Sequence, residues 1–202
     1  LTLAKTTAAV SATYTVGTYT ISVLGTLTIN SGVDFTSNGT TAISVGGDWT
    51  NSGTFTCGTA STVTFNGTAD QTLSGTLSGT TGKFYNLTMN NTGTTGNDDV
   101  ILGATTDIAG TLTLTDGDLN LGSYTTTLDG DLSYATAASI DYGTSTFVFN
   151  GSSKTVSGTK NYLSLYNVTV NASKSIADNF ETYVYGTTFT VNGTFTVGDG
   201  KR

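Results

Sequence analysis

The side chains best suited to chemistry in this chain are three pairs of closely spaced aspartates: Asp98/Asp99, Asp116/Asp118 and Asp129/Asp131. Two carboxylates about 5–9 Å apart can hydrolyse a glycosidic bond when the pKa of one is raised. Carboxylates are also the ligands that calcium prefers. Asp next to Gly is equally typical of turns, and neither the calcium-binding nonapeptide nor the twelve-residue calcium loop occurs. We therefore expect turn or surface positions, and we assign no catalytic residue and no metal ligand.

The chain lacks the other side chains on which most enzymes depend. It has no histidine, its only arginine is Arg202, and its only glutamate is Glu181. Histidine is the commonest general base near neutral pH and the commonest metal ligand. We therefore expect a protein that is not an enzyme and that uses no cofactor.

Composition indicates a β protein without nucleic-acid or membrane partners. The formal net charge is −7, and the seven basic residues form no cluster, whereas nucleic-acid binding needs a basic patch. No apolar run approaches the roughly 18 residues of a membrane span. Only 10% of the residues are charged, 10% are aromatic, and there are 26 glycines and no proline. Disordered chains are usually rich in charge and proline, and a chain without proline keeps every backbone N–H available for strand pairing.

Cys57 is the only cysteine. A lone thiol cannot form an internal disulfide, and a catalytic thiol needs a neighbouring base. Two interpretations remain: a small buried apolar side chain, or a disulfide between two copies of the chain, as an odd cysteine in a secreted protein suggests.

Eight asparagines begin an Asn-X-Ser/Thr sequon, which makes them candidate glycosylation sites: Asn38, Asn66, Asn86, Asn90, Asn150, Asn167, Asn171 and Asn192. Several sequons would arise by chance in a chain this rich in Thr and Ser. The alternative is that these asparagines end strands or form stacked ladders inside the coil.

A long internal repeat organises the whole chain. The segment Gly25-Thr-Leu-Thr-Ile returns as Gly110-Thr-Leu-Thr-Leu and again as Gly193-Thr-Phe-Thr-Val, at spacings of 85 and 83 residues. Phe65-Asn-Gly and Phe149-Asn-Gly, among other pairs, keep the same phase. We predict one continuous repeat domain over 1–202, with a partial unit 1–24, units 25–109 and 110–192, and a partial unit 193–202.

A shorter period of about 21 residues subdivides the large unit. Alternating apolar stretches begin near Thr20, Ala42, Val63, Phe84 and Thr105, and Gly- or Asn-containing turns separate them. Strict alternation indicates strands with one face buried, and even spacing near 21 fits the turns of a parallel β-helix. We predict an all-β fold, a β-solenoid of about nine or ten such turns. A tandem of antiparallel β-sandwiches, with hairpins every 8–12 residues, is the second choice.

Several phrases resemble repeat regions of very long secreted or surface proteins of bacteria and archaea: Gly47-Asp-Trp-Thr-Asn-Ser-Gly-Thr-Phe, Val63-Thr-Phe-Asn-Gly-Thr, Gln71-Thr-Leu-Ser-Gly and Phe84-Tyr-Asn-Leu-Thr. The resemblance covers nearly the whole chain. It implies an extracellular, cell-surface β-solenoid of the kind used in adhesin stalks, filaments, sheaths or surface layers, and it supplies no catalytic residue.

No amphipathic helix that would cap a solenoid is evident near either end of the sequence. An uncapped solenoid exposes unpaired strand edges, which monomeric repeat proteins normally cover. We therefore expect neighbouring copies, or flanking repeats of a longer protein, to cover these edges. End-to-end stacking of copies would give an amyloid-like cross-β homopolymer.

Two binding roles are the alternatives to a structural one. Exposed aromatics could contact a glycan, and the candidates are Tyr124, Tyr134, Tyr162 and Tyr183. Thr-X-Thr triplets could order water and bind ice, but this requires one flat face that carries the motif on successive turns. In the sequence the triplets are irregularly distributed, so we expect ordinary strand alternation with β-branched residues outward and rank ice binding lower.

Overall fold

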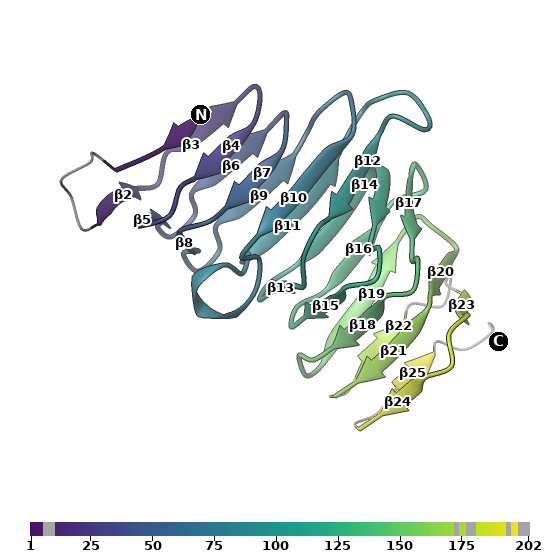
Figure 1. Ribbon diagram of the computed structural model, residues 1–202. Coiled ribbons are helices and arrows are strands. Elements are labelled where there is room, and N and C mark those ends of the chain that lie inside the picture. Colours follow the sequence, from purple (N-terminus) through teal and green to yellow (C-terminus); the bar gives the residue numbers. More distant parts are fainter. Residues whose placement is uncertain (6–10, 172–173, 177–180, 193–194, 198–202) are drawn as a thin grey trace.

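The computed structural model describes residues 1–5, 11–171, 174–176, 181–192 and 195–197. The chain is all-β and winds into a solenoid of about eight turns, spaced roughly 21 residues apart (Figure 1). Every strand pairing among the described residues is parallel, and each strand lies against its counterpart one turn away. The β-solenoid prediction is therefore confirmed, and the antiparallel alternative is wrong.

Nearly every turn of the coil contributes one strand to each of three faces. Face 1 contains β1 (Thr2–Leu3), β4 (Leu27–Ile29), β7 (Trp49–Asn51), β10 (Gln71–Gly75), β12 (Asp99–Leu102), the second half of β14 (Leu112–Asn120) and β17 (Ala138–Asp141). Face 2 contains β3 (Thr20–Val23), β6 (Ala42–Val45), β9 (Thr62–Phe65), β11 (Asn86–Asn90), the first half of β14, β16 (Leu132–Tyr134), β19 (Lys154–Gly158), β22 (Lys174–Ile176) and β25 (Phe195–Val197).

Face 3 is built in two parts. The first part contains β2 (Ala12–Val16), β5 (Val33–Ser37) and β8 (Thr54–Thr56). The second contains β13 (Thr106–Ile108), β15 (Thr125–Leu128), β18 (Thr146–Phe149), β21 (Asn167–Val170) and β24 (Phe189–Val191). Between them lies a segment with a single 3-10 turn, η1 (Gly79–Thr81). In chain order, β20 (Tyr162–Leu165) and β23 (Glu181–Val184) take the place of face 1 in the last turns.

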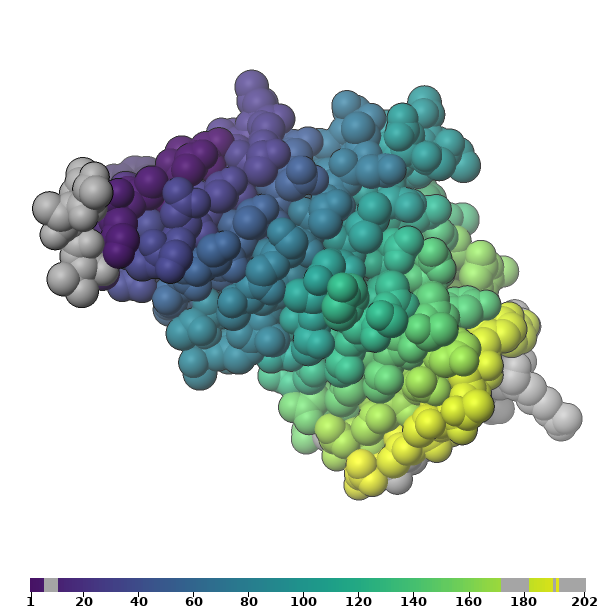
Figure 2. Space-filling model, viewed as in Figure 1, coloured from purple at the N-terminus to yellow at the C-terminus, as the bar shows by residue number. Residues whose placement is uncertain are grey.

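Alternation along each strand explains why the chain coils in this way. In β6, β9 and β11 the residues in register, Ile43, Val63 and Leu87, are buried, and the residues on either side of them are half-exposed. Because side chains alternate across a strand, each turn buries one row of apolar groups and turns a Thr/Ser-rich row outward. Figure 2 shows the turns as successive bands of colour along the molecule. No described helix is long and apolar enough to cross a membrane.

The turns are less even than the period predicts. Face 2 strands begin at Thr20, Ala42 and Thr62, as expected, but the next ones begin at Asn86 and Leu112. The stretches predicted to begin near Phe84 and Thr105 lie close to the starts of β11 at Asn86 and β13 at Thr106, but β13 belongs to face 3, so an even period of 21 residues does not hold along face 2. The segment that contains η1 and the loop before β12 lengthen these two turns, so the coil has about eight turns instead of nine or ten.

Between its first and second copies the long sequence repeat does not correspond to a whole number of turns. Matched segments of these copies lie on neighbouring faces: β7 of face 1 matches β16 of face 2, and β9 of face 2 matches β18 of face 3. The first half of β14 and its match β25, in contrast, lie four turns apart on face 2. The contacts nevertheless recur. The amide of Thr72 donates to the Asp48 carboxylate on face 1, and the amide of Thr155 donates to Asp131 on face 2, each at 2.8 Å. Matched segments thus form the same local contacts although they lie on different faces of the coil.

Two buried groups fix the middle of the coil. Trp49 is fully buried, and its ring packs edge-on against Phe55 and Phe84, with centroids 5.0 and 5.5 Å away. Gln71 is also fully buried, and its side chain bonds to the backbone of the preceding turn. The aromatic cluster joins the three faces, and the glutamine fixes a corner between faces 1 and 2.

Candidate functional site

The parallel stacking brings the aspartates of one predicted pair together with an aspartate from the next turn. One carboxylate oxygen from each of Asp98, Asp99 and Asp118 lies within 4.8 Å of the others, because Asp99 and Asp118 are register partners on face 1. Burial, and then repulsion from Asp70, raises the pKa of Asp99. The cluster is a partly exposed acidic patch. The sequence alone could not join Asp99 to Asp118, since that contact depends on the register between turns.

The remaining aspartates of the predicted pairs act singly. Asp116 accepts a hydrogen bond from the amide of Gly117, 3.0 Å away, which is a local turn contact. Asp129 accepts from the Asn150 amide group at 2.8 Å, and Asp131 accepts from the amide of Thr155. These last two carboxylates therefore connect consecutive turns, a role beyond the turn formation that the sequence predicts.

Three of the sequon asparagines form a ladder on face 3. The side-chain amide of Asn150 donates to Asp129, that of Asn171 donates to Asn150 at 3.2 Å, and that of Asn192 donates to Asn171 at 3.0 Å. These asparagines directly follow β18, β21 and β24, as the strand-ending interpretation predicts. They also stack, but the ladder is exposed, so the predicted position inside the coil is wrong.

The other sequons differ in how their side chains are engaged. The carboxamide oxygens of Asn86 and Asn167 accept hydrogen bonds from backbone amides of the next turn, and Asn90 is half-exposed. Asn38 and Asn66 are exposed. Glycosylation at any of the eight stays a prediction.

Cys57 follows β8 and is half-buried, packed against the apolar core. Burial raises the pKa of its thiol, while the Lys83 ammonium opposes that shift. A protonated thiol is a poor nucleophile. The packing fits the interpretation as a small apolar side chain, and the intermolecular disulfide stays a prediction.

The predicted glycan-contacting tyrosines divide into two groups. Tyr124, Tyr162 and Tyr183 are exposed, but Tyr134 is buried, and the prediction for it is wrong. Tyr134 falls on an inward position of β16, and burial raises the pKa of its hydroxyl. The sequence did not indicate the role of Lys160. Its ammonium group lies 4.9 Å from the Tyr162 ring centroid and donates to the carbonyl of Ala138 at 2.6 Å.

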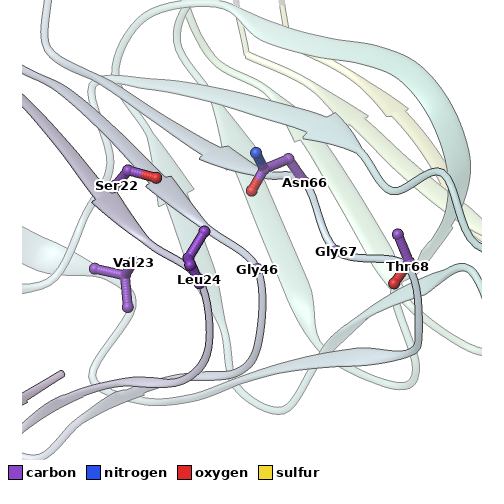
Figure 3. Close-up of a pocket in the computed structure, with 7 residues that line it drawn as sticks. All are labelled: Ser22, Val23, Leu24, Gly46, Asn66, Gly67 and Thr68. Carbon is purple, nitrogen blue, oxygen red and sulfur yellow. The ribbon is translucent and has the colours of Figure 1, made fainter.

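Two shallow hollows occur on the described surface. The first, about 190 Å³, lies where face 2 turns into face 1. Figure 3 shows Ser22 and Leu24 on one side of it and Asn66 and Thr68 on the other, with Gly46 between them. The second, about 330 Å³, lies beside η1 and is lined by Gly79, Thr80, Lys83, Asp107, Thr127, Asp129 and Asn150. Sequence patterns gave no signal for either hollow, because each combines residues from separate turns.

Face 2 presents two outward columns that run along the coil. The first column consists of hydroxyl residues on seven successive turns: Ser22, Ser44, Thr64, Thr88, Thr113, Ser133 and Ser157. Beside it runs a second column, each residue two positions earlier in its strand or the preceding turn: Thr20, Ala42, Thr62, Asn86, Thr111, Asp131 and Thr155. This face is the most regular surface of the described chain.

Comparison with known proteins adds no relative: no protein-family model matches the chain, and no curated protein and no solved structure is significantly similar to it.

Proposed function

We propose that this protein is a non-enzymatic, extracellular structural protein that extends by end-to-end stacking of β-strands into a sheath, filament or surface layer. The observation that carries the proposal is the state of the outermost described strands. At one end of the coil β3 pairs with β6 alone, and at the other β24 pairs with β21 alone, among the residues that the structure describes. Each open edge offers unpaired backbone groups to another parallel strand.

The apolar core supports the same proposal at the β3 end. Ile21 is only half-buried, although the residues in register with it on the next two turns, Ile43 and Val63, are almost fully buried. A strand laid on β3 would bury Ile21 in the same way. The added strand belongs to a second copy of the chain or, in a longer polypeptide, to a further repeat.

Blocking the β3 edge tests this proposal. The purified chain should form larger species in sedimentation velocity as its concentration rises, and electron microscopy should show rods of constant width. Ile21→Lys should abolish these species, because the charge would be buried between stacked copies at a cost of several kcal/mol. Ile101→Lys is the matched control, since Ile101 is a half-exposed outward residue in the middle of face 1 and should leave assembly unchanged. A wild-type chain that stays monomeric at high concentration would contradict the proposal, as would an Ile21→Lys variant that assembles normally.

Glycan binding by a surface stalk is the second candidate, favoured by a tyrosine surface in the last turns. Tyr142 and Tyr185 stack with ring centroids 5.0 Å apart and 10° between their planes, and the exposed ring of Tyr183 lies 6.3 Å from Tyr185. Flat aromatic faces beside polar groups suit the apolar faces of sugar rings. On a glycan array the chain should bind at least one glycan, and Tyr185→Ala should weaken that signal. An array without hits would remove this candidate.

A further inference from the structure

We propose that face 2 is an ice-binding surface, with the lattice of ordered water molecules as its ligand. Strand spacing places neighbouring hydroxyls of the first column about 4.8 Å apart, and residues i and i+2 of one strand stand about 6.6 Å apart. The second column carries a hydroxyl on every other turn, at Thr20, Thr62, Thr111 and Thr155. The two columns therefore form a rectangular grid whose repeat distances resemble those between oxygen atoms on exposed faces of hexagonal ice. This inference does not depend on the proposed stacking function.

The hydroxyls of the first column have hydrogen-bonding capacity to offer such a lattice. The side chains of Ser44, Thr64, Thr88, Thr113 and Ser133 make no hydrogen bond to any described residue, and all five are half-exposed. Each threonine also presents a methyl group beside its hydroxyl. A pattern of hydroxyls and methyls can hold an ice-like water layer, because the hydroxyls bond to water while the methyls occupy the spaces between the water molecules.

Rigidity of the grid follows from the packing behind it. The inward neighbours of these residues on face 2, such as Val63, Leu87 and Leu112, are almost fully buried. Close packing of such side chains holds the strands in one register. Binding to a crystal lattice then requires little loss of conformational entropy, which is the general advantage of a preorganised surface.

The chemistry of face 2 favours ice over the other ligands of such a surface. Neither column contains an aromatic residue, which the stacking of sugar rings requires. Among their fourteen positions Asp131 is the only formally charged side chain, so a charged polymer or a mineral surface finds little to bind. An uncharged, hydroxyl-bearing lattice is the ligand that matches.

The other faces do not repeat this pattern. On face 1 the threonines of the first turns give way to Ile101 and the acidic patch. On face 3, Val148 interrupts the column between Thr127 and Thr169. The Thr-X-Thr triplets look irregular in the sequence for this reason: they are spread over three faces, while the face 2 column accepts Ser as well as Thr.

Measurement of ice binding by the purified chain, without any partner, tests the proposal. The folded chain should show thermal hysteresis and should be enriched in a slowly growing ice crystal. Thr88→Tyr places a bulky ring in the middle of the grid and should lower the enrichment by about tenfold, which corresponds to about 1.4 kcal/mol. Thr36→Tyr is the matched control, because Thr36 is an equally half-exposed outward residue on the three-stranded part of face 3, and its enrichment should equal that of the wild type.

Circular dichroism melting confirms that both variants are folded before they are compared. A folded wild-type chain with neither thermal hysteresis nor enrichment in ice would overturn the proposal. Equal losses in the Thr88→Tyr and Thr36→Tyr variants would also overturn it, because the binding surface would then not be face 2. The presence or absence of rods by electron microscopy reports on stacking alone, so the two proposals fail independently.

Discussion

Replacing Gln71 by methionine should unfold the middle of the coil at much lower denaturant concentrations. The Gln71 amide nitrogen donates to the carbonyl oxygens of Val45 at 2.9 Å and Gly47 at 2.6 Å, and its oxygen accepts the amide of Gly67 at 2.8 Å. Methionine has nearly the same length and fills the same space, but it makes none of these bonds. The substitution therefore isolates the polar contribution of this corner.

The magnitude follows from counting the groups that are left without a partner. The carbonyl of Val45 keeps the amide of Asn66, 3.0 Å away, so it is not orphaned. The amide of Gly67 and the carbonyl of Gly47 have no other described partner in the backbone or side-chain bonds of this corner. Each buried polar group left unsatisfied costs about 1–3 kcal/mol. For the two groups together we expect a loss of about 2–6 kcal/mol in the free energy of unfolding, a large part of a typical total of about 5–15 kcal/mol.

Urea denaturation followed by the fluorescence of Trp49, the only tryptophan, measures this loss directly. Thr72→Val is the control, because Thr72 is the exposed neighbour and its backbone bond to Asp48 does not involve the side chain. That variant should stay within about 0.5 kcal/mol of the wild type. A Gln71→Met variant as stable as Thr72→Val would refute the reasoning, because it would mean that water replaces the glutamine at no cost.

Three further predictions test other parts of the fold. Trp49→Ala should cost about 3–5 kcal/mol, whereas Trp49→Phe should cost far less, because the buried indole N–H has no hydrogen-bond partner among the described residues. Urea unfolding followed by circular dichroism compares the two variants, and equal losses would argue against a tight aromatic cluster. Asp99→Asn should raise the melting temperature at pH 7. A raised carboxyl pKa in the folded state means that protonation stabilises the fold, so the stability of the wild type falls as pH rises from the ordinary value of 3.8 through the raised pKa. The advantage of Asp99→Asn should therefore disappear below pH 3.8, and a pH-independent advantage would contradict this cause. Gly47→Ala should cost about 1–3 kcal/mol in stability, because a Cβ atom there would stand 2.7 Å from the carbonyl carbon of Gly25. Gly25→Ala is the control, since a Cβ atom at Gly25 meets nothing within 4 Å. The melting temperatures of the two variants should differ, and equal stability would mean that the turns can separate at this corner.

Much of the fold could be predicted from the sequence because it depends on local patterns. Alternation in segments such as Thr62–Phe65 defines a strand with one buried side, and a spacing near 21 residues defines the turn. The hydrogen bond between Asp129 and Asn150 was not predictable from their sequence neighbours. Stacking of asparagines between turns was predictable, since similar residues recur at this period, but its place on the outside of the coil was not.

Tyr134 was mispredicted although its burial follows from local alternation: it stands two residues after the buried Leu132 in β16 and therefore points to the same, inward side. The other features that the sequence did not predict depend on which turn lies on which. The acidic patch arises only because Asp99 and Asp118 share a register. The hydroxyl column of face 2 was missed for a related reason: it mixes Ser44 and Ser133 with threonines, and only the register between turns places them in one line.

The change of face between the first and second copies of the long repeat has a consequence for folding fidelity. Tandem copies with similar sequences can mispair during folding, when one strand occupies the position that belongs to its duplicate. Here the segment at Trp49 lies on face 1 and its duplicate at Leu132 lies on face 2. A strand that took the place of its duplicate would therefore put its flanking segments on the wrong faces of the coil. The next turn could not pair with strands misplaced in this way, so the mispaired structure would be unstable and would dissociate.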